Sequence, residues 1–438
     1  MLIERYKLDF IKAALLLNTL KENPESYGNI LGLHKLIIRG VSKQEKLISY
    51  DKAGIKRLKF FKRNRKPSRE QSIVINDVID KLTDRVMQRK HIIFLYKCFG
   101  DGIANVYQSM YALKHLYYDK NYRIKEDAGY ISGKSGFIRE WKVFLTGLKH
   151  GVPVVMSDIT NIIRTGDVCA LGGEDPVPIE VKLTKHDNPS ARVRRQIENI
   201  NEIVSFYDND YAPMFRGVGD TYRVPLTFKQ KDYISDVNIL MKTCQDQSYA
   251  FKEVEKGLLY VCIHATAAKS DWEILMKEID TILNPKSTLS IFINPEESWG
   301  VAYPFTLSFT PPNLIRYIYG EFVILILVDL EYIRGEFAKN KLHAVFLMDG
   351  TTSIQFCKDP NDLTQGVFRI SEQNFLRNFI SFLSLEIFIK EQCRYFDQDL
   401  YPIKGVSTDE YESLLESGRI LSEEILKDWS EAKDCLRD

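Results

Sequence analysis

The 438-residue chain is expected to have a mixed α/β fold, and three observations predict it. Apolar residues recur at helical spacing in two stretches of the first 90 residues. Short apolar runs bounded by turn residues begin at residue 91, and strand and helix patterns alternate in the last third. Hydrophobic residues make up 45% of the chain and charged residues 27%, which excludes disordered, collagen-like and coiled-coil proteins.

Length and composition also bound the organisation of the chain. At about 100–200 residues per domain, the length predicts two or three domains. We expect a helical, basic N-terminal region over residues 1–90, a central domain over 91–268, and a C-terminal α/β domain over 269–438 that ends in an acidic helical tail. The net charge of +1 excludes a globally basic coat protein that binds nucleic acid over its whole surface.

Cysteine usage and hydropathy predict the compartment. The seven cysteines are scattered and contain no Cys-x-x-Cys pair, which is typical of a reducing, cytoplasmic environment. No apolar run approaches the roughly 20 residues of a spanning helix, so no membrane partner is expected.

The N-terminal region is expected to hold two helices joined by a basic stretch. Helical spacing extends from Ile3 to Leu20 and from Gln71 to Gln88. Residues 52–69 between them contain nine Lys or Arg and no acid, with Phe60 and Phe61 interleaved. Such a stretch either follows a phosphate backbone while its aromatic rings stack on bases, or is a solvated loop.

The central domain is expected to alternate strands and helices. Residues 91–96 are typical of a buried strand, residues 100–102 of a tight turn, and residues 103–118 of a helix. After a Gly-rich loop at 127–136, the pattern predicts these elements in order: a helix at 137–149, strands at 152–163, 167–171 and 178–184, and a helix at 192–207.

The remaining sequence predicts a second mixed region. Its expected elements are a helix at 233–242, strands at 257–263, 289–293, 322–328 and 344–347, and helices within 372–393. Residues 405–438 hold ten acids against four bases, and they would pack on the body, join a partner chain or compete with nucleic acid for a basic groove.

One group of residues has a pattern typical of a catalytic site. Asp167 opens a strand, and Glu180 and Lys182 follow in the next strand. Because side chains alternate between the faces of a strand, Glu180 and Lys182 would share one face about 6–7 Å apart, within reach of Asp167. The chain has two other Asp/Glu-x-Lys patterns, at 140–142 on an expected helix and at 431–433 near the C-terminus, and neither has this strand context.

This arrangement resembles the PD-(D/E)XK nuclease superfamily, whose restriction-endonuclease-like core runs helix, three strands, helix, strand. The resemblance covers residues 137–207, with an extension to Ile263 left open. It implies that Asp167 and Glu180 bind metal, that Lys182 assists catalysis, and that Glu140 on the preceding helix is an accessory catalytic acid and metal ligand. Gly166 stands where the family has its proline.

The resemblance also implies a substrate and partners. Gln196, Arg195 and Arg192 on the following helix resemble the polar face that some branches place beside the phosphate. Carboxylate oxygens suit Mg²⁺ or Mn²⁺, which polarises a phosphodiester and activates water, while a lysine stabilises developing negative charge. The implied function is metal-dependent hydrolysis of nucleic acid, with DNA favoured over RNA, in a homodimer or with a partner bound through the C-terminal domain. By analogy alone, the organisation resembles bacterial restriction or antiphage effectors.

Two alternatives stay open. The first is a catalytically silent nucleic-acid-binding or scaffold protein with the same fold. The second is a P-loop NTPase, because residues 128–135, ending in Lys134 and Ser135, fit a relaxed P-loop pattern. A P-loop follows a buried strand, and residues 121–127 are too polar for one, which favours a plain Gly-rich loop. Asp158 is expected to make hydrogen bonds at a strand end or to line the site.

Overall fold

The structure is a computed structural model, and it describes residues 2–119, 123–124, 130–181, 191–217, 219–266, 271–295, 300–359 and 367–397. The fold is mixed α/β, as the sequence predicts. The chain forms two compact units, one of residues 1–224 with 295–319 and the other of residues 225–294 with 320–438. These limits differ from the expected boundaries at 90 and 268. Residue 90 lies inside a helix, and the four-stranded sheet of the second unit takes strands from both sides of residue 268.

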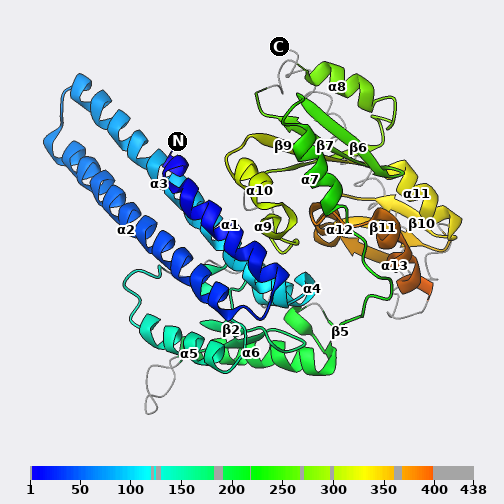
Figure 1. Ribbon diagram of the computed structural model, residues 1–438, viewed down its shortest axis with the longest axis horizontal. Helices are drawn as coiled ribbons and strands as arrows, with labels where there is room; N and C mark the ends of the chain where they lie inside the picture. Colours follow the sequence, from blue (N-terminus) through cyan, green and yellow to red (C-terminus); the bar gives the residue numbers. More distant parts are fainter. Residues whose placement is uncertain are drawn as a thin grey trace. The chain divides into compact units, whose positions relative to one another are not determined.

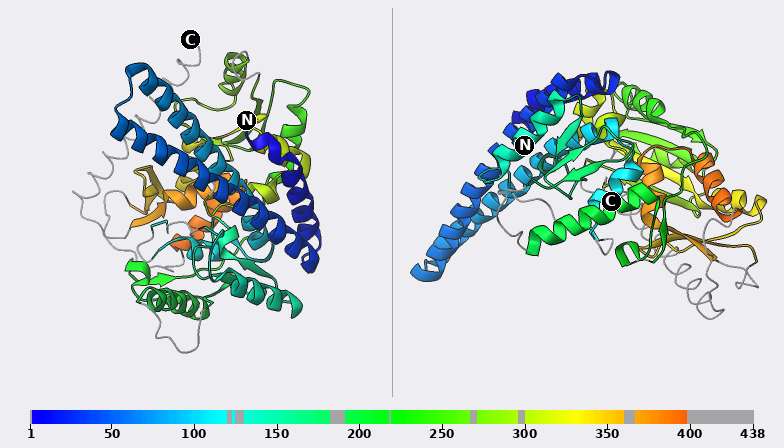
Figure 2. Two further views of the ribbon diagram at one scale, coloured as in Figure 1. Left: turned by 90° about the vertical axis from the view of Figure 1, so that its left-hand side faces the viewer. Right: turned by 90° about the horizontal axis from the view of Figure 1, so that it is seen from below.

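The first unit is built on long helices (Figure 1). They are α1 (Lys7–Glu22), α2 (Tyr27–Arg65) and α3 (Arg69–Tyr107), preceded by the 3₁₀ helix η1 (Leu2–Tyr6) and followed by α4 (Met110–Tyr117). In both views of Figure 2, α2 and α3 lie side by side as an antiparallel pair.

The connection between α2 and α3 is short because its residues stop one helix and start the next. Lys66 ends α2 in the left-handed conformation, with φ of 43°. Ser68 then begins α3 with a capping box, in which its side chain accepts from Gln71 N and the Gln71 side chain accepts from Ser68 N, both at 3.2 Å. The basic stretch 52–69 therefore lies mostly on the distal half of α2 and not in a connection between two helices, so the alternative of a solvated loop is wrong.

The predicted strand at 91–96 and turn at 100–102 are also wrong, because both lie inside α3. Ile92, Leu95 and Tyr96 of this run are buried, and a continuous apolar run this short does not distinguish a strand from a helix. The two glycines let other backbone and side chains approach the helix. A Cβ at Gly100 would lie 2.0 Å from Ile159 O, and one at Gly102 would lie 2.5 Å from Leu17 Cδ2.

A helix, three strands and a helix follow in the predicted order. They are α5 (Phe137–Lys149), β1 (Val154–Met156), β2 (Val168–Ala170), β3 (Val177–Ile179) and α6 (Ala191–Asn209), with the 3₁₀ helix η2 (Ser157–Ile159) after β1. The strands form an antiparallel sheet in the order β1-β2-β3, with Val168 opposite both Met156 and Ile179. The helix bounds are close to prediction, and the strands are shorter.

The strand that would complete the family's core is not in this sheet. The strand after α6, β4 (Tyr211–Ala212), pairs with β5 (Thr221–Tyr222) in a separate two-stranded sheet, with the 3₁₀ helix η3 (Phe215–Gly217) between them. The extension of the resemblance to Ile263 is wrong, because that residue lies on a strand in a sheet of the second unit.

Residues 295–319 return to the first unit from a distant part of the chain. They form α9 (Phe305–Ser308) and α10 (Pro311–Ile318), which pack on α1. Lys21 Nζ donates to Leu307 O at 2.9 Å, and Thr306 Oγ1 donates to Cys98 O at 3.1 Å.

The second unit holds two antiparallel sheets. The first has the order β6-β7-β9-β8, and the second has the order β10-β11-β12. Their strands are β6 (Tyr249–Glu255), β7 (Leu258–His264), β8 (Thr288–Ile293), β9 (Phe322–Asp329), β10 (His343–Phe346), β11 (Thr352–Cys357) and β12 (Val367–Ser371). The helices are α7 (Ile234–Thr243), α8 (Trp272–Ile279), α11 (Leu330–Lys339), α12 (Glu372–Ile380) and α13 (Leu385–Asp397).

The core of the larger sheet is apolar and matches the predicted pattern. Trp272 and Leu275 of α8 pack against Leu259, Val261 and Leu325 of the central strands. The predicted strands of this region are confirmed, and the helices predicted within 372–393 are α12 and α13. The acidic tail at 405–438 lies outside the described residues.

A search of the described residues finds no helix long and apolar enough to cross a membrane.

Candidate active site

Three carboxylates surround one ammonium group in the first unit. Lys134 Nζ lies 2.8 Å from Asp158 Oδ2, 3.0 Å from Glu140 Oε2 and 3.2 Å from Asp167 Oδ1. We call these four residues the acidic cluster. Its carboxylates come from α5, from η2 and from the residue before β2, so the cluster forms only when these elements pack together.

Glu140 lies at the start of α5 and is buried, with only 2% of the residue exposed. It lies in the first turn of the helix, at the end that favours negative charge. Gly136, just before the helix, leaves room for it, because a Cβ there would lie 2.8 Å from Glu140 Oε1.

The β1–β2–β3 meander positions Asp158 and Asp167. Ser157 N donates to Asp167 O at 3.0 Å, which brings the residue before Asp158 against Asp167. On the other side, Asp167 N donates to Ile179 O at 2.9 Å, and Asp167 Oδ2 accepts from Val181 N at 2.9 Å. One oxygen of Asp167 is thus fixed by backbone, while the other faces Lys134.

The backbone at Gly166 explains why this chain lacks the proline that PD-(D/E)XK nucleases have at the corresponding position. Its φ is +76°, whereas a proline ring fixes φ near −65°. A Cβ at this position would also lie 2.9 Å from Ile179 N. The backbone that presents Asp167 therefore requires glycine.

The loop that carries Lys134 is held by α2. The buried Glu45 carboxylate accepts from Ile131 N at 3.0 Å and from Ser132 N at 2.8 Å. These two bonds fix the loop two and three residues before Lys134, so α2 determines where the ammonium group lies.

A second contact ties α2 to the sheet. The buried His34 ring accepts from Met156 N at 3.3 Å, so its Nδ1 donates to Ile30 O at 2.8 Å, and the ring stacks on Phe144 with centroids 4.0 Å apart. Burial lowers the pKa of His34 to about 3, and the ring is therefore neutral at physiological pH.

The cluster favours a charged lysine. Burial alone would lower the pKa of Lys134, but the hydrogen bond and charge of Asp158, with those of Glu140 and Asp167, outweigh burial and raise the pKa above its ordinary value. Burial raises the pKa of Glu140, an effect that Lys134 opposes. Three carboxylates share one positive charge, so the site attracts further cations.

The structure brings together two of the predicted site residues, Glu140 and Asp167. Glu180 lies one residue beyond β3, half-buried and next to the Val181 amide that binds Asp167. Lys182 lies outside the described residues. That it shares a strand face with Glu180 stays a prediction. On α6, Arg195 is exposed and Gln196 is half-buried, while the side chain of Arg192 is outside the described ones.

Sequence reasoning missed Lys134 as a member of the site and did not choose between two roles for Asp158. Lys134 was visible only as the lysine of a relaxed P-loop pattern, and the loop that precedes α5 is indeed there. Its partnership with Asp158, 24 residues later, is a tertiary contact that no local spacing encodes. Glu45 was missed for the same reason.

The donor set of the acidic cluster suits a hard divalent cation, because all its acceptors are carboxylate oxygens. Within the described residues, however, no group of three or more His, Cys, Asp or Glu is arranged to hold a metal ion. The carboxylates are drawn to Lys134 instead. A divalent cation would therefore have to displace this ammonium group.

Comparisons of the chain with protein-family models, with curated proteins and with solved structures find no match.

Proposed function

We propose that this protein is a metal-dependent nuclease that hydrolyses phosphodiester bonds, with DNA as the favoured polymer. One observation carries the proposal: Glu140, Asp158 and Asp167 converge on a single positive charge. They do so within the order helix, three antiparallel strands, helix that the resemblance to PD-(D/E)XK nucleases requires. A role as a bacterial restriction or antiphage effector remains part of the proposal by analogy alone.

Glu140 and Asp167, with Glu180, are the residues proposed to hold Mg²⁺ or Mn²⁺. A bound divalent cation would polarise the phosphodiester and lower the pKa of a water molecule. The chain's own contribution is orientation, because the Val181 amide fixes one oxygen of Asp167, while the other, which contacts Lys134, would face the cation that displaces this ammonium group. Burial of Glu140 and Asp158 keeps their carboxylates from being fully hydrated.

Positive side chains are proposed to act on the phosphate. Lys182 would stabilise the negative charge that develops during hydrolysis, and Arg192, Arg195 and Gln196 would contact the backbone from α6. Lys134 is a second lysine available for this role. Once a divalent cation takes its place among the carboxylates, its ammonium group becomes available to a phosphate oxygen.

A second candidate is a catalytically silent protein that binds nucleic acid or serves as a scaffold. Lys134 favours it, because an ion cluster already neutralised by a lysine is a structural feature that needs no metal. This candidate predicts nucleic-acid binding that does not depend on metal and is unaffected by Lys182→Ala. A P-loop role is disfavoured, because the three carboxylates at Lys134 would repel a phosphate group.

A cleavage assay distinguishes the candidates. Wild type, Asp167→Ala and Lys182→Ala would be incubated with plasmid, linear duplex, single-stranded DNA and RNA, each with Mg²⁺ or Mn²⁺. The proposal predicts metal-dependent products from wild type alone, and the substrate panel identifies the polymer. Equal products from all three proteins, or binding without products under every condition, would contradict it.

A further inference from the structure

The distal half of α2 carries a concentration of positive charge. Residues 52–69 contain nine Lys or Arg and no acid, and nearly all of them are exposed. In Figure 1 this part of α2 and the facing part of α3 extend as a pair beyond the rest of the first unit. Asp51 marks the start of the stretch, where it pairs with Arg85 at 2.6 Å and Arg89 at 2.9 Å.

Four of these residues form a line on one side of α2. They follow Glu45 by 7, 11, 14 and 18 positions, and we call them the basic stripe: Lys52, Lys56, Lys59 and Arg63. At 100° per residue, all four lie within about 40° of Glu45 around the helix axis. His34, 11 positions before Glu45, lies on this side as well.

The side of α2 that carries the stripe is the side that holds the acidic cluster. Glu45 binds the loop of Lys134, and His34 binds β1. At 1.5 Å per residue, the stripe begins about 10 Å from Glu45 along the axis and ends about 27 Å from it. All four side chains are exposed, and within the described part of the chain none of them makes a hydrogen bond or an ion pair.

We propose that the basic stripe is a docking track for the backbone of a DNA duplex that reaches the acidic cluster, an inference that rests on the proposed nuclease function. Charges separated by about 4.5–6 Å along the helix can contact successive phosphates of a backbone that runs beside it. The exposed Phe60, adjacent to the stripe, adds an apolar surface to this flank.

Charge decides against one other occupant of the stripe, and the position of the stripe decides against a second. A second copy of the chain would bring an equally basic stretch against this one, and like charges at close range repel. An anionic membrane would attract the same cations. It would not, however, require the stripe to lie on the one flank of α2 that leads to the acidic cluster.

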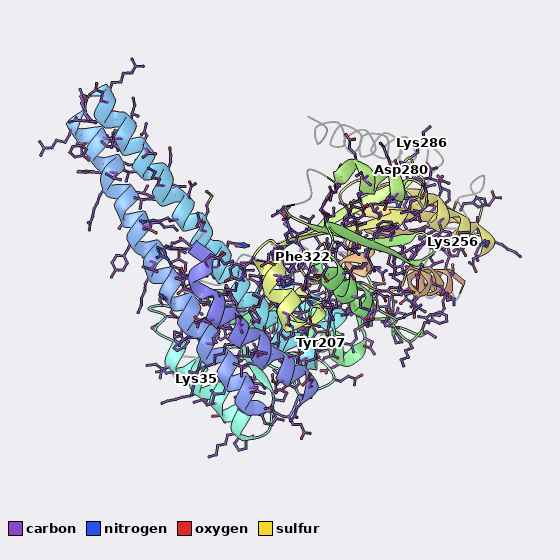
Figure 3. The ribbon with its side chains drawn as sticks, turned by 45° about the horizontal axis from the view of Figure 1, so that its top comes forward. Lys35, Tyr207, Lys256, Asp280, Lys286 and Phe322 are labelled. Atoms are coloured by element: carbon purple, nitrogen blue, oxygen red, sulfur yellow. The ribbon has the colours of Figure 1, made fainter. Side chains whose placement is uncertain are left out.

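The test uses two full-length variants with equal loss of charge. The stripe variant carries Lys52→Gln, Lys56→Gln, Lys59→Gln and Arg63→Gln. The control variant carries Lys35→Gln, Lys46→Gln, Arg57→Gln and Arg65→Gln, which are exposed residues of α2 about 80–160° around the axis from Glu45. Lys35 is labelled in Figure 3, which also shows the side chains of the distal helix pair projecting outward. Glutamine keeps a good helix propensity, so both variants are expected to fold.

Binding would be measured by fluorescence anisotropy with a labelled duplex of about 20 base pairs, in EDTA so that no cleavage occurs, over a range of salt concentrations. The stripe variant is expected to bind about tenfold or more weakly than wild type, and its slope of log affinity against log salt should fall by about 3–4. The control variant should keep most of both values.

Three outcomes would overturn the docking track. They are equal losses in both variants, no loss in either, and binding to phosphatidylcholine–phosphatidylserine vesicles that depends on the stripe while duplex binding does not. Cleavage is scored separately. Stripe-dependent binding without metal-dependent cleavage would contradict the nuclease proposal alone, and cleavage with unchanged binding by the stripe variant would contradict the docking track alone.

Discussion

Lys134 is the residue on which the charges of the candidate site converge. Its ammonium group is the shared partner of Glu140, Asp158 and Asp167, of which Glu140 and Asp158 are almost fully buried. A salt bridge on the surface contributes little to stability, but removing one partner of a buried pair leaves a charge without compensation. Lys134 is therefore expected to stabilise the fold as well as to mark the site.

Lys134→Gln is expected to lower the free energy of unfolding by about 3 kcal/mol at neutral pH, because it leaves three carboxylates facing one another. Urea unfolding measures this loss, with Lys142→Gln on the exposed side of α5 as the control. The raised pKa of Lys134 means that its stabilisation is full below the ordinary value of about 10.4 and is lost as pH rises through the raised one. A loss no larger than that of the control would show that the cluster does not depend on the ammonium group.

The burial of His34 predicts that the free energy of unfolding falls at acid pH. Its folded pKa of about 3 lies below the unfolded value of about 6.5, so its contribution to stability is present above pH 6.5 and is lost as pH falls toward 3. From pH 6.5 to 4.5 this loss amounts to about 2 kcal/mol, because the limiting slope of about 1.4 kcal/mol per unit is reached only below the unfolded pKa. The difference in unfolding free energy between wild type and His34→Gln should shrink by this amount from pH 6.5 to 4.5. An imidazole NMR titration with a midpoint near 6.5 in the folded protein would refute the prediction.

At the scale of elements, amphipathic helices were predictable, whereas a continuous apolar run within a helix was not. The helix at 137–149 was predicted to the residue, because its polar and apolar faces repeat clearly. Residues 91–96 were predicted as a strand, because a continuous apolar run this short has no periodicity that distinguishes a strand from a helix. Gly100 strengthened that error. Gly100 allows α3 to approach the backbone at Ile159 closely, and this contact is visible only in the packed structure.

Gly100→Ala is expected to destabilise the protein by about 1–3 kcal/mol, although alanine is the better helix former, because its Cβ would collide with Ile159 O. Gly28→Ala on α2 is the matched control, since nothing lies within 4 Å of a Cβ there. Thermal unfolding would compare the two variants. Equal stabilities would mean that α3 does not approach this backbone as closely as described.

For the whole molecule, the sequence predicted the fold class but not the grouping of its segments. The first unit includes residues 295–319, and the hydrogen bond from Lys21 to Leu307 joins residues 286 positions apart. Contacts at such separation leave no local pattern. The candidate site was likewise only partly predictable from local sequence. Glu140 and Asp167 were found through a motif, whereas Lys134 joins them only through tertiary packing.

A chain that ends at Val224 is therefore expected to be less stable than one in which residues 295–319 follow through a flexible linker. Without this segment, the surface of α1 that α9 and α10 cover would be exposed to water. Circular dichroism during heating would compare the two chains. Equal melting temperatures would show that residues 295–319 are not part of the first unit.

The central claim is that carboxylates of the acidic cluster bind a divalent cation in place of the Lys134 ammonium group. Isothermal titration of Mn²⁺ into wild type, Asp167→Asn, Lys134→Gln and the surface control Asp77→Asn tests it most directly. The account predicts one binding event in wild type, at least about tenfold weaker in Asp167→Asn, tighter in Lys134→Gln and unchanged in Asp77→Asn. No binding by wild type, or equal affinity in Asp167→Asn, would contradict it.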